Sequence, residues 1–150
     1  MFLRLRSSKG FTILELLIVI AVIAILVGIA LPRFKGMKDE GNYAKAKGEL
    51  RSLQTAAESY RIHHSGYPAD LASATLNAAS PQILAAAPKD AFDTANDYTY
   101  FISTNGLYYV ILSKGPGGTT TVTAITDVGA LTGATGDDIW VSNGTIQSGG

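Results

Sequence analysis

The stretch that decides the fold is GFTILELLIVIAVIAILVGIALP, residues 10–32. From Phe11 to Leu31 its only charged side chain is Glu15. An α-helix rises about 1.5 Å per residue, so this run would span roughly 31 Å, close to the thickness of the hydrocarbon core of a bilayer. The stretch therefore predicts a transmembrane α-helix.

Glu15 is the unusual residue of this run, because it lies only four residues inside it. A carboxylate at the centre of a membrane helix costs about 2.5 to 3.5 kcal/mol on insertion scales, and such residues usually have a function. One interpretation is that Glu15 reaches back to the lipid headgroups. The other, which we favour, is that another chain supplies a positive partner at this depth.

An ordinary secretory signal is the rival interpretation of this stretch. It would use Arg4, Arg6 and Lys9 as a basic leader and would be cut after Gly28 or Ala30. Apolar regions of such signals run about 7 to 15 residues. The run here is longer, contains an acid, and continues past Pro32 into a helical pattern, so we expect it to be retained.

The junction Lys9-Gly10-Phe11-Thr12-Ile13-Leu14-Glu15, followed by an apolar run and Pro32, resembles the class III signal of the type IV pilin superfamily. The resemblance implies that an inner-membrane prepilin peptidase cuts after Gly10 and N-methylates Phe11. Residues 1–10 would then be a cleaved leader. It also implies that Glu15 of an incoming subunit is attracted to the Phe11 amine of the subunit at the fibre base.

Composition excludes several kinds of site. The chain has no cysteine, which rules out disulfides, thiolate metal sites and thiol nucleophiles. Cleavage after Gly10 would remove three of the 12 basic residues and leave nine against 12 acidic ones, a net charge of −3, so we expect no nucleic-acid partner. Within the resemblance, the missing cysteines favour the pseudopilins of type II secretion, whose major members hold their C-terminal loop with calcium.

A second helical segment is predicted over residues 33–64. Its apolar residues recur at spacings of four and three, which places them on one face: Ala46, Leu50, Leu53, Ala57 and Tyr60. We expect this amphipathic half to pack on its own domain and to end near His63, with Gly66 as the C-terminal cap ahead of Pro68. A metal pair at His63 and His64 is not expected.

Residues 65–150 are predicted to form one domain with an antiparallel sheet. One or two short helices are expected in the Ala-rich connection 69–91, and strands are expected over 98–104 and 107–113. Asn105-Gly106 favours a two-residue type I′ turn between these strands. A third strand is expected between Thr119 and Thr126. The fold class is thus α+β, a long N-terminal α-helix packed on a small C-terminal sheet, as in the pilin fold that the resemblance implies.

Several segments of this domain resemble signatures of the major pseudopilins. They are Gly66-Tyr67-Pro68, the run from Pro88 to Asp93, the run from Ser113 to Gly118, and Asp137-Asp138-Ile139-Trp140. The last resembles the calcium loop, so Asp137 and Asp138 are predicted calcium ligands and Asp127 a less certain third. Calcium takes six to eight oxygen ligands. The alternative is that these acids are solvated turn residues, and we expect no other cofactor.

The sequence contains no nucleophile elbow, phosphate-binding loop or His-Glu metal spacing, so an enzyme is not expected. The resemblance implies a single-pass protein of the bacterial inner membrane with its C-terminal domain in the periplasm. An assembly platform with its ATPase would extract it, together with minor pilins, into a helical homo-oligomeric filament. We favour a type II secretion pseudopilin.

Three alternatives remain. One is a type IV pilus pilin that serves adhesion, motility or DNA uptake. The second is a membrane-anchored binding module that never polymerises, and the third is a secreted enzyme with a cleaved signal.

Overall fold

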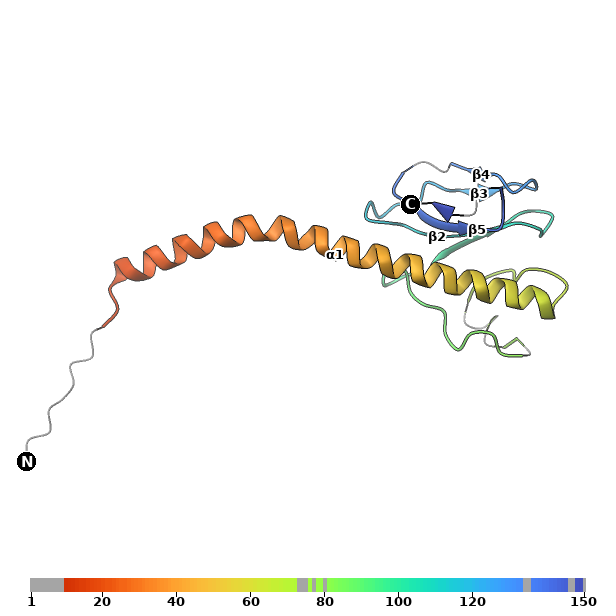
Figure 1. Ribbon diagram of the computed structural model, residues 1–150, viewed down its shortest axis with the longest axis horizontal. Coiled ribbons are helices and arrows are strands. Elements are labelled where there is room, and N and C mark those ends of the chain that lie inside the picture. Colours follow the sequence, from red (N-terminus) through yellow and green to blue (C-terminus); the bar gives the residue numbers. More distant parts are fainter. Residues whose placement is uncertain are drawn as a thin grey trace, which may run out of the picture. The chain divides into compact units, whose positions relative to one another are not determined.

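The computed structural model describes residues 10–72, 76, 78–79, 81–133, 136–145 and 148–149. Residues 1–9 of the predicted leader lie outside these ranges. The chain divides into two compact units, Met1–Lys38 and Asp39–Gly150. Sequence reasoning divided the helical part at residues 32 and 33 instead, where the apolar run ends. The fold is α+β, with one long helix followed by a small antiparallel sheet, as predicted (Figure 1).

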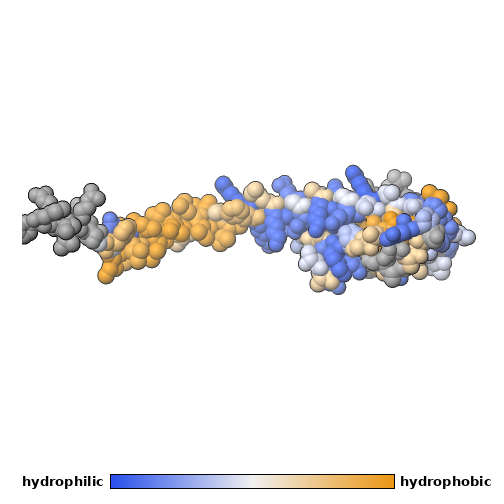
Figure 2. All heavy atoms as spheres, turned by 90° about the horizontal axis from the view of Figure 1, so that it is seen from below, coloured by the Kyte–Doolittle hydropathy of each residue, from blue (hydrophilic) through white to orange (hydrophobic). Residues whose placement is uncertain are grey.

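Helix α1 runs from Ile13 to His63 and passes through Pro32 without leaving the α-helical conformation. In the first unit its side chains have no partners to bury them. The large apolar residues of this part are exposed all along the chain between Phe11, which is 79% exposed, and Met37, which is 67% exposed. Figure 2 shows this part of the helix as an almost unbroken apolar surface.

In the second unit, α1 buries one face against the sheet. Its buried residues are Ala46, Leu50, Leu53, Ala56 and Ala57, and Tyr60 packs against the same cluster. The predicted apolar stripe is therefore confirmed. Polar contacts tie the same helix to the sheet, since the Tyr98 hydroxyl donates to Glu49 at 2.6 Å and the Tyr109 hydroxyl donates to Glu58 at 2.8 Å.

The main sheet has four antiparallel strands in the order β1-β2-β5-β6. Their bounds are β1 Thr99–Ile102, β2 Tyr109–Ser113, β5 Ile139–Ser142 and β6 Ser148–Gly149. A separate antiparallel pair consists of β3 Ala124–Ile125 and β4 Leu131–Thr132. β3 lies within the run where a third strand was predicted, but it joins this second sheet.

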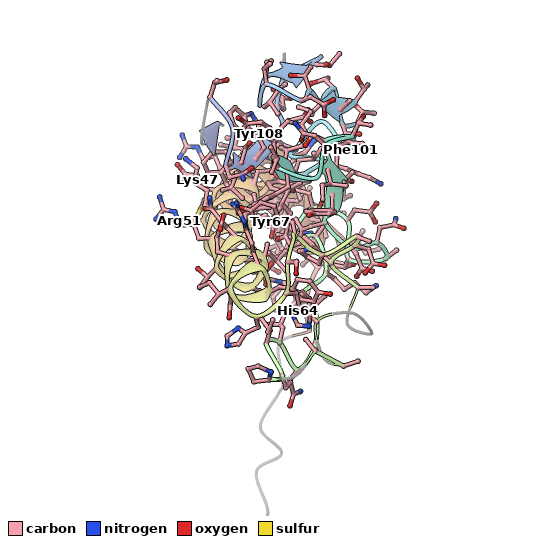
Figure 3. All side chains as sticks on the ribbon, turned by 90° about the vertical axis from the view of Figure 1, so that its right-hand side faces the viewer. Lys47, Arg51, His64, Tyr67, Phe101 and Tyr108 are labelled. Atoms are coloured by element: carbon pink, nitrogen blue, oxygen red, sulfur yellow. The ribbon has the colours of Figure 1, made fainter. Side chains whose placement is uncertain are left out.

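The central strand β2 is buried on both faces. Because side chains alternate along a strand, Tyr109 and Ile111 join the cluster on α1. Val110 and Leu112 join a second cluster with Val122, Ile125 and Trp140. Phe101 and Tyr108 pack on this second cluster (Figure 3). Of the five aromatic residues in and around the hairpin, Tyr98, Tyr100 and Tyr109 therefore pack toward α1, whereas Phe101 and Tyr108 pack on the other side of the sheet.

The hairpin between β1 and β2 is present, but the predicted type I′ turn is wrong. That turn needs positive φ at both central residues, and among these residues only Gly106 has it, at 70°. Instead Ser103 accepts from Gly106 through its carbonyl and from the Tyr108 amide through its hydroxyl. Asn105 uses its amide and side chain to bond Asp127. These side-chain bonds stabilise a longer loop.

One other prediction is corrected. The helix ends at His63 as expected, but Gly66 does not adopt the left-handed conformation of a C-terminal cap. Ring nitrogens of the two histidines bond the last carbonyls instead, His63 Nδ1 to Ser59 and His64 Nδ1 to Tyr60. In the connection, Leu76 is helical and its amide donates to the Ala72 carbonyl at 3.2 Å, as the expected short helix requires, whereas residues 81–91 are not helical. Residues 73–75, 77 and 80 lie outside the described part.

Candidate functional site

The predicted processing junction lies outside α1. Gly10, Phe11 and Thr12 precede the first helical residue, Ile13. Gly10 is exposed, and no atom would meet a Cβ placed on it within 4 Å. Phe11 is exposed as well. The peptide bond after Gly10 is thus in a non-helical segment that a peptidase can reach.

Thr12 and Glu15 form a reciprocal cap on the first turn of α1. The Glu15 amide donates to Thr12 Oγ1 at 3.1 Å, and the Thr12 amide donates back to Glu15 Oε2 at 3.2 Å. The Thr12 hydroxyl also donates to Oε2 at 3.1 Å. This arrangement is a capping box, which satisfies amides that have no partner at the start of a helix.

The capping box gives Glu15 a third role that sequence analysis missed. The signal was present, since Thr-x-x-Glu directly before an apolar run is typical of a helix start. Within the described part of the chain, Oε2 takes both of the hydrogen bonds that Glu15 accepts. Oε1 is therefore available to a positive group from outside this chain.

The first unit presents a large apolar surface with no cover. Among its exposed apolar residues are Leu14, Leu16, Ile18, Ile20, Ile23, Leu26, Ile29 and Phe34. Helix α1 is long and apolar enough to cross a membrane, and none of its most apolar part is buried. Exposed apolar surfaces of this size mark contact with a membrane or with other proteins.

Asp138 occupies a buried position that joins the C-terminal loop to the run before β3. Only 4% of the residue is exposed. Its Oδ2 accepts three hydrogen bonds, from the Thr121 amide and hydroxyl at 2.7 Å each and from the Val122 amide at 2.9 Å. Its Oδ1 is buried and has no hydrogen-bond partner. An unpaired buried carboxylate oxygen is costly, and a cation would relieve that cost.

Asp137 lies against the turn that follows β2. A Cβ on Gly117 would come 3.1 Å from Asp137 Oδ2, and one on Gly115 would come 2.0 Å from the Asp137 carbonyl oxygen. Gly115 has φ of 62°, so a side chain there would also strain the backbone. The loop can approach this closely only because residue 115 is glycine, whereas a side chain at position 117 would require Asp137 Oδ2 to shift by a few tenths of an ångström.

Asp127 is not brought to this loop. Its Oδ1 accepts from the Asn105 amide at 2.9 Å, and its carbonyl accepts from the Asn105 side chain at 3.0 Å. The described ranges contain no group of three or more His, Cys, Asp or Glu residues that could hold a metal ion. A calcium ion would fit at Asp137 and Asp138 only if backbone carbonyls supplied most of its oxygen ligands, as calcium sites allow.

The N-terminal segment of the chain is similar to a known protein family. Residues 5–31 match the family model described as the prokaryotic N-terminal methylation motif. The N-terminus of this chain is thus similar to prokaryotic N-terminal methylation segments. We call the matched residues the prepilin segment for their similarity to type IV prepilins. It includes the Gly10-Phe11 junction, the capping box and the apolar run from Phe11 to Leu31.

Curated relatives extend the similarity beyond the prepilin segment. The chain is 33% identical over 66 residues to the type II secretion system core protein G of Klebsiella michiganensis, covering 44% of this chain and 46% of that protein. It is 32% identical over 63 residues to the core protein G of Aeromonas hydrophila, covering 42% and 44%. A fimbrial protein of Pseudomonas aeruginosa is 42% identical over 55 residues, covering 37% and 36%.

The chain thus spans less than half the length of these relatives. No solved structure matches the chain.

Proposed function

We propose that this chain is a non-enzymatic, structural subunit of a type IV pilus-like filament, of the type II secretion pseudopilin kind. The observation that carries the proposal is the uncovered apolar half of α1, in which Glu15, the acid of the capping box, is the fifth residue after the predicted cleavage site. Lipid covers this surface before assembly and other copies of the chain cover it afterwards. The relatives named core protein G support the secretion branch.

Processing creates the charge that assembly uses. A prepilin peptidase removes residues 1–10 and methylates Phe11, which leaves a positive amine at the start of an apolar helix. Glu15 Oε1 of an incoming subunit then pairs with the Phe11 amine of the subunit at the fibre base. Uncompensated charges in lipid are costly, so pairing them between chains favours addition and fixes the axial register.

The remaining partners follow from the same proposal. The subunit waits in the bacterial inner membrane with its C-terminal domain in the periplasm, and an assembly platform with its ATPase moves it into the filament. Minor pilins join the same structure. Calcium bound by Asp137 and Asp138 would hold the loop that connects to β5.

The test separates the charge of Glu15 from its capping role. Glu15→Gln keeps a side chain that can complete a capping box but removes the charge. Thr12→Val removes the capping hydroxyl and keeps the charge. We expect Glu15→Gln, as the sole subunit, to lower filament yield at least tenfold, with normal membrane insertion and normal cleavage after Gly10. Filaments are counted by electron microscopy.

Two controls make the result specific. Glu40→Gln removes an exposed charge further along the same helix and should leave filament number unchanged. Thr12→Val should assemble better than Glu15→Gln, because the charge pair survives. Normal filaments from Glu15→Gln would contradict the proposed mechanism and would reduce Glu15 to a helix cap.

A type IV pilus pilin is the second candidate, because one relative is named a fimbrial protein. The two candidates differ in what the filament is needed for. Deletion of the gene should abolish protein export if the chain is a secretion pseudopilin. It should abolish surface filaments and leave export intact if the chain is a pilus subunit.

A further inference from the structure

Three basic side chains follow the apolar run directly, and we name Arg33, Lys35 and Lys38 the basic collar. No acidic residue lies between Glu15 and Asp39, so the collar is the first charge met after the apolar run. All three residues are exposed. The ion pairs found among the described residues are Lys45–Glu49, Lys89–Asp97 and Lys114–Asp93, and none of them uses the collar.

An apolar groove reaches the basic collar along one face of α1. It is lined by Leu26, Ile29, Ala30, Arg33, Phe34 and Met37. Their spacings of three and four place them on a single helix face. Phe34 and Met37 are 65% and 67% exposed, so the exposed apolar surface continues beyond the apolar run and Pro32. Arg33 is the only charged residue of the groove.

The position of the groove matches the boundary between hydrocarbon and headgroups. If the apolar run to Leu31 fills the hydrocarbon core, Met37 lies roughly 9 Å beyond it along the helix. The polar headgroup layer adds about 5 to 7 Å on each side of the core. Leu26 and Ala30 thus lie at the depth of acyl chains, and Arg33 and Lys35, about 3 and 6 Å beyond Leu31, lie within the headgroup layer. Lys38, about 10 Å beyond Leu31, can reach the phosphates only through its long flexible side chain.

We propose that this face of α1 is a binding site for an anionic phospholipid. One acyl chain lies along Leu26, Ala30 and Phe34, and the headgroup phosphate pairs with Arg33, Lys35 and Lys38. The inference rests on the proposed function only in requiring that α1 spans a membrane. Its consequence is that the bound lipid fixes the depth of the subunit, so these contacts must break before the subunit leaves the bilayer.

Charge complementarity selects this occupant over a second copy of the chain. A second copy at the same depth would bring its own three cations against the collar, and like charges repel. Anionic headgroups carry the opposite charge and attract juxtamembrane basic residues. Each Lys or Arg raises the affinity for an anionic membrane surface about fivefold. A free phosphate ion would leave the apolar groove uncovered.

The probe is the full chain in nanodiscs that contain equal amounts of phosphatidylglycerol and phosphatidylcholine. Native mass spectrometry then measures which lipid stays bound as the disc is removed. We expect phosphatidylglycerol to exceed phosphatidylcholine at least fivefold. The variant Arg33→Gln/Lys35→Gln/Lys38→Gln should bring this ratio close to one.

The matched control is Lys45→Gln/Lys47→Gln/Arg51→Gln, which removes the same charge from exposed positions further along α1. Lys47 and Arg51 project away from the domain in Figure 3. This control should keep the preference for phosphatidylglycerol. A second variant, Phe34→Ser/Met37→Ser, should lower the amount of both retained lipids, because the groove then holds acyl chains less well.

Two outcomes would overturn the lipid site alone. One is equal retention of both lipids by the unmodified chain, which would refute the lipid site and leave the filament function standing. The other is an equal loss of preference in the matched control, which would show an effect of net charge alone. A chain that does not insert into the nanodisc bilayer would refute the membrane span itself, and with it both the lipid site and the proposed function.

Discussion

At the scale of single residues, two buried carboxylates hold the loops around the sheet, and they differ in how well they are satisfied. Asp90 is 1% exposed and accepts from the Phe92 amide, the Ser113 hydroxyl and the Lys114 amide, so both of its oxygens have partners. Asp138 is equally buried but has partners on only one oxygen. The first is therefore a complete structural link, and the second has capacity for a ligand.

Asp90→Ala should be strongly destabilising, because it leaves three donors of the 90–93 turn and the end of β2 without their acceptor. Hydrogen bonds to a charged group contribute about 1.5 to 3 kcal/mol each, so we expect a loss of at least about 3 kcal/mol in the free energy of unfolding. Urea denaturation measures this loss. The control is Asp97→Ala, which breaks an exposed ion pair with Lys89 and should cost about 1 kcal/mol or less. Equal midpoints for the two variants would contradict this role of Asp90.

Calcium should raise the melting temperature if Asp137 and Asp138 bind it, because a ligand that binds only the folded state stabilises that state. We expect chelation to lower the melting temperature of the full chain in detergent. Asp137→Asn should abolish the calcium effect without touching the three hydrogen bonds of Asp138. Asp127→Asn, at the separate hairpin loop, should keep it. A melting curve that chelator does not change would show these acids to be ordinary loop residues.

At the scale of elements, sequence patterns predicted what depends on local periodicity and missed what depends on distant partners. The apolar run, the stripe Leu50, Leu53 and Ala57, and the strands β1 and β2 all follow from repeating patterns. β5 was missed because it is a four-residue strand next to two acids, and it is defined by pairing with β2. The predicted type of the hairpin turn was wrong because the loop conformation depends on contacts between Asn105 and Asp127, which is 22 residues away.

Tyrosine hydroxyls in and beside the sheet bond the C-terminal half of α1, which makes the domain sensitive to alkali. Burial raises the pKa of Tyr98, Tyr100 and Tyr109 above the ordinary value of about 10. For Tyr98 and Tyr109, hydrogen bonds to Glu49 and Glu58 raise the pKa further. The folded domain therefore holds these protons when the unfolded chain would release them.

These tyrosines should contribute their full stabilisation to the free energy of unfolding below about pH 10. The free energy of unfolding should fall as the pH rises above that value, because the unfolded state then binds fewer protons than the folded state. Urea denaturation at a series of pH values measures this dependence. Tyr109→Phe, which keeps the ring and removes one titrating group, should reduce the slope above pH 10. A free energy of unfolding that stays constant into strong alkali would contradict the burial of these hydroxyls.

At the scale of the whole molecule, the two units have opposite relations to water. The unit Asp39–Gly150 has a core on each face of β2 and can bury its own apolar side chains. The first unit exposes nearly all of its apolar side chains and needs a membrane or other chains to cover them. The end of the apolar run predicted a division from sequence, but at residues 32 and 33 instead of 38 and 39. The Thr12 cap, although encoded in residues 9–15, became apparent only from the hydrogen bonds of the first turn.

The central claim is that the mature protein keeps the apolar half of α1. Cleavage after Gly10 would make a methylated Phe11 the new N-terminal residue, which takes part in assembly. The most direct test is the intact mass of the mature protein from cells that contain a prepilin peptidase. We predict a mass that has lost residues 1–10 and gained one methyl group. A chain cut after Gly28 or Ala30, and so lacking the apolar segment, would contradict the account and indicate an ordinary secretory signal.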